Sequence, residues 1–216
     1  MYNRKDMKEK ELSRLEALKN YENKLYSEGL NYIAGIDEAG RGPLAGPVVV
    51  ASVILPKDSL IEGINDSKKI SETKREKLYE KILEEAVSYG VGIVWQDEID
   101  EINILNATKK ALTDAINQME VKPDRILVDA LDKIDTNGIP YTSVIKGDAK
   151  MYSIGAASII AKVTRDRIMR EYDEVYPEYG FAGHKGYGTA KHIEAIKTVG
   201  ICPLHRRSFV KNFERG

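Results

Sequence analysis

Five short apolar runs, set between stretches of helical character, limit the folds that this chain can adopt. The runs are predicted as strands because of their length and β-branched content, and they cover about 31–38, 47–55, 89–95, 125–129 and 141–145. Helices are predicted over about 7–28, 71–89, 103–119, 153–172 and 189–199. Strands interleaved with helices favour a single α/β domain, here with a helical C-terminal portion.

Bulk properties exclude several classes of protein. With 216 residues, of which 42% are hydrophobic and 31% charged, the chain can build one sizeable globular core. No apolar run approaches the roughly 20 residues that a membrane helix needs, so no membrane association is expected. Cys202 is the only cysteine, which excludes an internal disulfide and a multi-cysteine zinc site and makes a cytoplasmic location the expectation.

The net charge of −1 does not by itself indicate a partner, but the bases are unevenly distributed. They gather in the C-terminal part of the chain, at Lys146, Lys150, Lys162, Arg165, Arg167, Arg170, Lys185, Lys191, Lys197, Arg206, Arg207, Lys211 and Arg215. This part could attract a polyanion. A solvated helix face would show the same pattern, and charge alone favours that interpretation.

The segment 35–47 holds an unusual combination of residues. Asp37 and Glu38 end an apolar run, although carboxylates are depleted from strands. Oxygen ligands for a divalent cation would explain the pair. In the Gly40-Arg41-Gly42 turn that follows, glycine permits close backbone approach to a ligand and arginine can meet a phosphate. An ordinary hairpin turn uses similar residues, so this segment alone does not decide.

Two further aspartates follow apolar runs in the same way. Asp129 ends the strand predicted over 125–129, and Asp148 comes shortly after the next one. Each could simply cap a turn or a helix. If the strands are neighbours, however, Asp37, Glu38, Asp129 and Asp148 converge, and such a cluster repels itself unless divalent cations neutralise it. Two Mg²⁺ or Mn²⁺ ions about 4 Å apart would suit phosphodiester hydrolysis.

The ordered set of motifs resembles ribonuclease HII, the type 2 ribonuclease H family. The resemblance extends from about residue 31 to 210 and is carried by the segments 35–47, 65–69, 127–130, 146–150, 156–166, 184–189 and 203–209. It implies a ribonuclease H-like mixed five-stranded sheet flanked by helices. Residues 1–30 would then be an N-terminal helical extension, and 31–216 the catalytic domain with its C-terminal helical region.

The resemblance also implies an activity and residue roles. The chain is expected to act as a monomer, cutting the RNA strand of RNA–DNA hybrids and cutting 5′ to single ribonucleotides in duplex DNA. The four carboxylates named above would hold two Mg²⁺ or Mn²⁺ ions. Nucleic-acid contacts would come from Gly40, Arg41 and Gly42, which sense the ribose 2′-hydroxyl through backbone groups, from Ser67 and Lys68 at phosphates, and from Tyr187 stacking at the RNA–DNA junction. His184, His192 and His205 are expected to be structural or phosphate-facing.

Two other interpretations compete with this one. A different ribonuclease H-like enzyme, such as a transposase or junction resolvase, would share the carboxylates, but the Gly40-Arg41-Gly42 turn combined with the Tyr187 motif argues against it. A non-catalytic phosphate-binding module could be built on the glycine-rich turn. The glycine spacing matches neither a P-loop nor a dinucleotide fingerprint, and four carboxylates would not help such a module.

Overall fold

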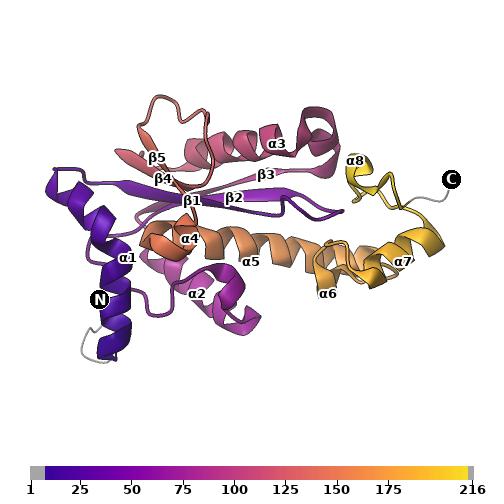
Figure 1. Cartoon of the computed structure of the whole chain (residues 1–216), viewed down its shortest axis with the longest axis horizontal. Helices are drawn as coiled ribbons and strands as arrows, with labels where there is room; N and C mark the ends of the chain where they lie inside the picture. Colours follow the sequence, from indigo (N-terminus) through magenta and orange to yellow (C-terminus); the bar gives the residue numbers. More distant parts are fainter. Residues whose placement is uncertain (1–7, 214–216) are drawn as a thin grey trace.

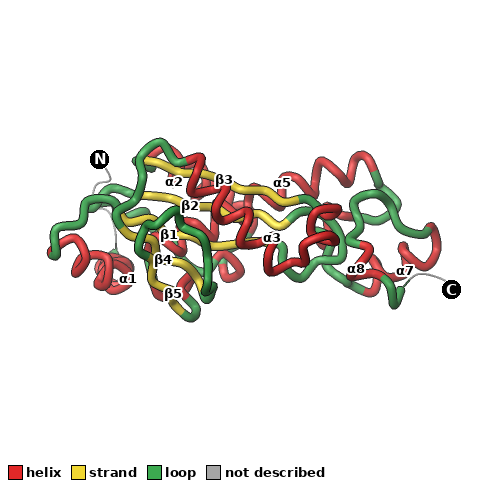
Figure 2. Tube along the Cα trace, turned by 90° about the horizontal axis from the view of Figure 1, so that it is seen from above, coloured by secondary structure: helices red, strands yellow, loops and turns green. Residues whose placement is uncertain are grey.

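A mixed five-stranded sheet runs through the centre of the structure, a computed structural model that describes residues 8–213. The strands are β1 (Ile33–Ala39), β2 (Val48–Ile54), β3 (Ser88–Val94), β4 (Arg125–Asp129) and β5 (Tyr141–Val144). Figure 2 shows them in the order β3-β2-β1-β4-β5. β1 pairs antiparallel with β2 and parallel with β4; β2 and β3 are antiparallel, and β4 and β5 are parallel. The predicted fold class is confirmed.

Helices cover both faces of this sheet (Figure 1). The helices are α1 (Glu9–Ser27), α2 (Glu72–Glu85), α3 (Gln96–Gln118), α4 (Gly147–Lys150), α5 (Tyr152–Val175), α6 (Phe181–His184), α7 (Ala190–Val199) and α8 (Arg207–Val210), with a 3₁₀ turn at Ser67–Lys69. α3 packs on one face, α5 and α2 lie on the other, and α6, α7 and α8 gather at the end of the sheet away from α1. Within residues 8–213, none of the helices has the length and hydropathy of a membrane span.

The central strands are buried on both sides, which explains their continuous apolar runs. In β2, Val48 and Val50 pack toward α3, whereas Ala51 and Val53 pack toward α5. On β1 the helix α5 comes so close that a Cβ atom at Gly35 would lie 2.1 Å from the carbonyl carbon of Ser153. Glycine is therefore the residue that lets α5 sit against the strand that ends in Asp37 and Glu38.

The strand predictions agree with the structure to within a few residues, and the helix boundaries differ more. α2 ends at Glu85 rather than near 89, because β3 already begins at Ser88, and Ser71 occupies the N-cap position without a side-chain cap bond. α3 begins at Gln96, earlier than the predicted start at Asn103. Residue 7, the predicted start of the first helix, lies outside the described residues.

Asn103 nevertheless marks a genuine helix start inside α3. Its backbone is left-handed, with φ of 66°, and interrupts the helix. The Asn103 side-chain oxygen accepts hydrogen bonds from the N–H groups of Leu105 and Asn106, both at 3.1 Å. These are the bonds of an N-cap, so the predicted start at 103 coincides with the start of a helical segment, and the helical segment before it was missed.

The N-terminal helix α1 is packed against the rest of the chain. Leu15 and Leu25 are buried. The carboxylate of Glu22 accepts hydrogen bonds from the Ser153 N–H and hydroxyl, at 2.9 and 3.0 Å, at the first turn of α5. An acid at a helix N-terminus is favourable, and burial raises the pKa of Glu22. The separate extension over 1–30 stays a prediction, but these contacts fix α1 to α5.

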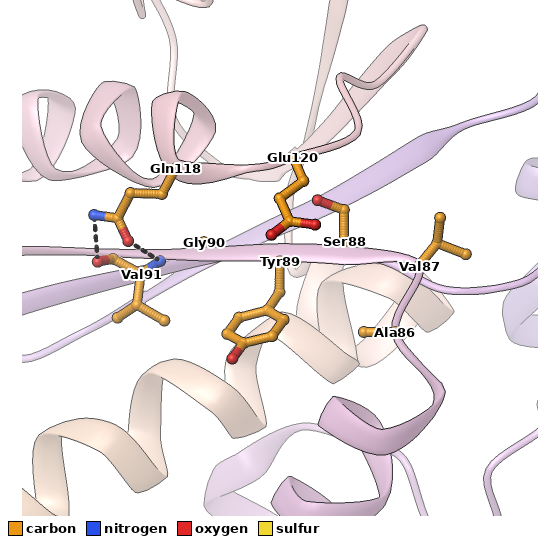
Figure 3. Close-up of a pocket in the computed structure, with 8 residues that line it drawn as sticks. All are labelled: Ala86, Val87, Ser88, Tyr89, Gly90, Val91, Gln118 and Glu120. Carbon is orange, nitrogen blue, oxygen red and sulfur yellow. Dashed lines mark hydrogen bonds between the residues drawn. The ribbon is translucent and has the colours of Figure 1, made fainter.

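The strand β3 forms one of the two edges of the sheet, and a side chain covers part of it (Figure 3). The Gln118 amide donates to the Val91 carbonyl at 3.0 Å and accepts from the Val91 N–H at 3.3 Å. Gln118 thus replaces the neighbouring strand that an edge residue lacks. A pocket opens beside this contact, lined by Ala86, Val87, Ser88, Tyr89, Gly90, Val91, Gln118 and Glu120. Because β2 separates β3 from β1, this pocket is not formed by the strands that carry Asp37 and Asp129.

Candidate active site

The topology brings three of the four predicted carboxylates together. β1 and β4 are parallel neighbours in which Ile36 lies opposite Val128, so the next residues along them are Asp37 and Asp129. Asp148 stands in the first turn of α4, just after β5. One ligand oxygen from each of Asp37, Asp129 and Asp148 can be chosen so that all three lie within 4.8 Å of one another.

Local hydrogen bonds hold these carboxylates in place. The Gly147 N–H donates to Asp129 Oδ1 at 2.7 Å and so ties the turn before Asp148 to the end of β4. Asp37 Oδ1 accepts from the Glu38 N–H at 2.8 Å. The Ser158 hydroxyl, from α5, is close enough to the Asp37 carboxylate to lower its pKa, against the stronger effect of burial. α5 therefore supports the site from beneath the sheet, in addition to filling the core.

Glu38 belongs to the same site but stands apart from the group of three. Adjacent residues of a strand point to opposite faces, so Glu38 points away from the face that Asp37 shares with α5. The Glu38 carboxylate lies 3.5 Å from Arg41 Nη1. Burial raises the pKa of Glu38; the Arg41 guanidinium opposes the rise and the Asp129 charge adds to it, so Glu38 and Asp129 are close enough to interact.

The cluster resists carrying its full negative charge. Burial, the charge of Glu38 and the charge of Asp129 hold the pKa of Asp37 well above its usual range. Burial and the charges of Asp66 and Asp129 also raise the pKa of Asp148. Buried carboxylate oxygens that repel one another form a donor set suited to a hard divalent cation, which would neutralise them. These residues therefore fit the metal ions that the sequence indicates.

Lys68 and Ser67 lie beside the cluster in different ways. Burial alone would lower the pKa of Lys68, but the charges of Asp148, Asp37 and other acids outweigh it and raise that pKa. The Lys68 ammonium thus faces the carboxylates. Ser67 is only 3% exposed, and its hydroxyl is hydrogen-bonded at 2.8 Å to that of Ser158. This places Ser67 behind Asp37, so the geometry does not favour the direct phosphate contact predicted for it.

The two glycines of the Gly40-Arg41-Gly42 turn serve different needs. Gly40 has φ of +98°, and a Cβ atom there would lie 2.2 Å from Arg165 Nε, so the fold itself requires glycine. Gly42 is exposed, and a Cβ atom there would meet only Tyr187 Cε1, at 3.9 Å. Packing against the described residues therefore does not require glycine at 42.

Tyr187 is next to this turn, as that contact with Gly42 shows. Its side chain is 43% exposed, in agreement with an exposed ring in a Gly-Tyr-Gly turn. The Arg165 guanidinium carbon lies 5.9 Å from the ring centroid. The same guanidinium donates to the carbonyls of Ala45, Pro47 and Lys185, at 3.1, 2.9 and 2.9 Å. Arg165 therefore joins the loop 40–47 to the turn that carries Tyr187.

Sequence reasoning assigned the C-terminal bases to the surface, and the structure corrects this for several of them. Arg165 and Arg206 are 1% and 0% exposed. Arg167 and Arg170 are ion-paired with Glu72, Glu76 and Glu80. These four arginines therefore do not form an unpaired basic face. The only signal that could have singled out Arg165 and Arg206 is their place within the resembling segments.

The three histidines are structural, one of the two expectations. His192 Nδ1 lies 2.9 Å from the Tyr187 carbonyl oxygen, which it can bond only as a donor, and His192 Nε2 lies 3.0 Å from His205 Nε2. His184 Nδ1 accepts from the Gly186 N–H at 3.1 Å. Burial, followed by the neighbouring His192, lowers the pKa of His205 to about 4. His184 and His192 thus bind the backbone of the Tyr187 turn from the interior of the protein, and His205 supports His192.

Comparison with known sequences points to one family. The model of the ribonuclease HII family matches residues 34–212. A ribonuclease HII from Ruminiclostridium cellulolyticum is 58% identical over 214 residues, which cover 98% of this chain and 83% of that protein. A ribonuclease HII from Caldanaerobacter subterraneus is 60% identical over 208 residues, covering 96% of this chain and 86% of that protein.

Solved structures with the same architecture lead to the same family. The ribonuclease H2 of Pyrococcus horikoshii OT3 gives a TM-score of 0.71 at 31% identity, covering 85% of this chain and 97% of that one. The RNase HII of Archaeoglobus fulgidus, solved as a complex with PCNA, gives a TM-score of 0.69 at 30% identity with the same coverage. The chain therefore belongs to the ribonuclease HII family and is a metal-dependent ribonuclease H.

Proposed function

We propose that this chain cuts the RNA strand of RNA–DNA hybrids and also cuts duplex DNA on the 5′ side of a single embedded ribonucleotide. The observation that carries the proposal is that the carboxylate cluster lies next to the glycine-rich turn. One oxygen from each of Asp37, Asp129 and Asp148 lies within 4.8 Å of the others, and the Gly40-Arg41-Gly42 turn, in which Arg41 and Gly42 are exposed, begins three residues after Asp37 in the chain. Cleavage chemistry and recognition of the cleaved strand therefore share one site.

The carboxylates Asp37, Glu38, Asp129 and Asp148 would hold two Mg²⁺ or Mn²⁺ ions. Bound there, the ions would supply an activated water and stabilise the leaving oxygen of the phosphodiester. The protein's own contribution is orientation, because the Glu38 N–H fixes the Asp37 carboxylate and the Gly147 N–H fixes that of Asp129. The Lys68 ammonium, which already faces these acids, would hold a phosphate of the cut strand.

Recognition of ribose would come from the turn and from Tyr187. A 2′-hydroxyl is the group by which a protein distinguishes RNA from DNA at a given nucleotide. Gly42 lacks the side chain that would keep a sugar away from the backbone of the turn. Tyr187, partly exposed beside Gly42, would stack on the adjoining deoxyribose at an RNA–DNA junction.

Cleavage of defined substrates tests the proposal. Three labelled substrates are compared with Mg²⁺, with Mn²⁺ and with EDTA: a duplex with one ribonucleotide, the same duplex in all-DNA form, and a long hybrid. We expect cleavage of the first and third only, dependent on the metal, with 3′-hydroxyl and 5′-phosphate ends. A water nucleophile leaves no 2′,3′-cyclic phosphate, so a cyclic product would contradict the mechanism. Cleavage of the all-DNA duplex at an equal rate would contradict ribose recognition.

A further inference from the structure

Two guanidinium groups lie buried beneath the Gly40-Arg41-Gly42 turn, which is proposed to recognise ribose. Arg165 and Arg206 are 1% and 0% exposed. Within residues 8–213, neither side chain forms an ion pair with a carboxylate. Asp166, the neighbour of Arg165 in the chain, pairs with Arg75 and Lys162 instead. Both arginines instead donate all their side-chain hydrogen bonds to main-chain carbonyls. Burying two like charges without an anion is costly, so their position calls for an explanation.

Arg206 bonds the turn itself. Its guanidinium donates to the carbonyls of Gly40, Arg41 and Gly46, at 2.6, 3.0 and 2.9 Å. The Arg206 N–H also donates to the Leu44 carbonyl, at 2.8 Å. One side chain thus binds both carbonyls that lie between Gly40 and Gly42, and it closes the far end of the same loop.

These bonds determine where the neighbouring N–H groups point. In a trans peptide the C=O of one residue and the N–H of the next point in opposite directions. Because the Gly40 and Arg41 carbonyls point inward to Arg206, the N–H groups of Arg41 and Gly42 point outward. Both residues are exposed, and in the part of the chain that the structure describes neither N–H donates a hydrogen bond. Two adjacent, unused donors on the surface form a site for an acceptor oxygen.

We propose that Arg206 is the positioning residue for ribose specificity: it holds the Gly40 and Arg41 carbonyls inward and thereby presents the Arg41 and Gly42 N–H groups to a ribose 2′-oxygen. This inference rests on the proposed function, because it takes the ligand to be the ribonucleotide that the enzyme cuts. Arg206 touches no substrate and acts through the turn. A donor pair held ready for a hydroxyl penalises a nucleotide that lacks it, because the donors lose water without gaining a partner.

Arginine suits this task because of its shape. The guanidinium is planar and carries five donors in a fixed fork, which lets one side chain bind three carbonyls at once. Lysine keeps the positive charge but carries one ammonium on a flexible stem, so it cannot hold the same three carbonyls in one geometry. Arg206→Lys therefore keeps the positive charge at residue 206 and removes the hydrogen bonds that orient the two peptide groups.

Arg165→Lys is the matched control. Arg165 is equally buried and also donates to three carbonyls, but these belong to Ala45, Pro47 and Lys185 and not to Gly40 or Arg41. A general weakening of the loop would affect both variants alike. Loss of the outward N–H pair is expected in Arg206→Lys alone.

The experiment measures binding of two labelled duplexes by fluorescence anisotropy at matched salt, one with a single ribonucleotide and one all-DNA. Asp37→Asn in every protein prevents cleavage. We expect Arg206→Lys to lower the preference for the ribonucleotide duplex about tenfold, the combined effect of two hydrogen bonds. Arg165→Lys, which loosens the Tyr187 turn but not the Gly40 and Arg41 carbonyls, is expected to lower that preference less. An unchanged preference in Arg206→Lys, or an equal loss in both variants while circular dichroism shows them folded, would overturn the proposal.

A second measurement needs no change at residue 206, in case Arg206→Lys does not fold. The amide signals of Arg41 and Gly42 are followed by ¹H–¹⁵N NMR in the Asp37→Asn protein as each duplex is added. We expect both amides to shift further with the ribonucleotide duplex, and equal shifts with the two duplexes would contradict the inference. Failure of the wild-type protein to cut the ribonucleotide duplex would instead refute the proposed function.

Discussion

Replacing Gly42 with alanine tests most directly whether a substrate backbone meets the turn. Gly42 does not have a positive φ, and the new methyl group would lie 3.9 Å from Tyr187 Cε1, an ordinary van der Waals distance. The folded protein should therefore accept the change without strain. Alanine also restricts the unfolded chain, so we expect stability to rise by about 0.4–1 kcal/mol. For a chain of this size, that gain raises the melting temperature by roughly 1–4 °C.

Activity should move in the opposite direction. The added methyl stands on the exposed side of the turn, where the ribose would approach the Gly42 N–H. A displacement of the reacting groups of about 1 Å costs on the order of a hundredfold in rate, which corresponds to about 2.7 kcal/mol of transition-state stabilisation. We therefore expect kcat/KM on the single-ribonucleotide duplex to fall about a hundredfold while the melting temperature does not fall.

Gly40→Ala provides the contrast, measured with the same thermal melts and initial-rate assays. Its methyl group would lie 2.2 Å from Arg165 Nε, at a φ of +98° that disfavours any residue with a side chain. We expect a loss of stability of about 1–3 kcal/mol. Wild-type cleavage by Gly42→Ala would refute the view that a substrate approaches this glycine. Equal destabilisation of the two variants would refute the packing argument that separates them.

Three further outcomes are expected. Asp37→Asn should lose most cleavage and, without metal, melt higher, by roughly 2–4 °C if relief of repulsion gains about 1 kcal/mol; a lower melting temperature would contradict the self-repulsion of the cluster. Tyr187→Ala should impair cutting at a single ribonucleotide about ten- to a hundredfold, and a long hybrid less, whereas Tyr187→Phe should be mild; equal losses on both substrates would make the ring a packing residue. Burial lowers the pKa of His205 from 6.5 to about 4. Between about pH 4 and pH 6.5, the unfolded chain therefore binds a proton at this residue that the folded chain does not bind. Stability should therefore fall by roughly 3 kcal/mol as pH drops from about 6.5 to about 4, and denaturant unfolding should show a flatter pH profile for His205→Gln; a parallel profile would be inconsistent with this assignment.

Periodicity and composition were sufficient to place the five strands because each is a short apolar run between polar segments, whereas the mixed sheet was predicted from the family resemblance. They were less reliable for helix ends. The end of α2 was missed because the first glycine after Glu85 is Gly90, and the early part of α3 was missed because Asn103 begins a second helical segment within it. Local sequence marks a cap, and only tertiary packing decides whether another helical segment precedes it.

For the candidate site, the sequence indicated the carboxylates and the exposed side chains. It did not indicate the buried polar side chains that support them. Asp37, Asp129 and Asp148 could be placed together because each follows a strand. Ser67 and Arg206 could not be placed, because serine and arginine are usually exposed and nothing local shows that a hydroxyl or a guanidinium turns inward. Their burial depends on contacts with Ser158 and with Gly40, which are far away in the chain.

The bridge that Arg165 makes between the loop 40–47 and the Tyr187 turn has a consequence for the energetics and timing of recognition. Loops that order only on binding spend part of the interaction energy on lost conformational freedom. Here the carbonyls of Pro47 and Lys185 are bound to one guanidinium before any duplex arrives. The two elements are therefore expected to engage the duplex as a single rigid unit. Substrates with and without a ribonucleotide should then associate at similar rates and differ mainly in how long they remain bound.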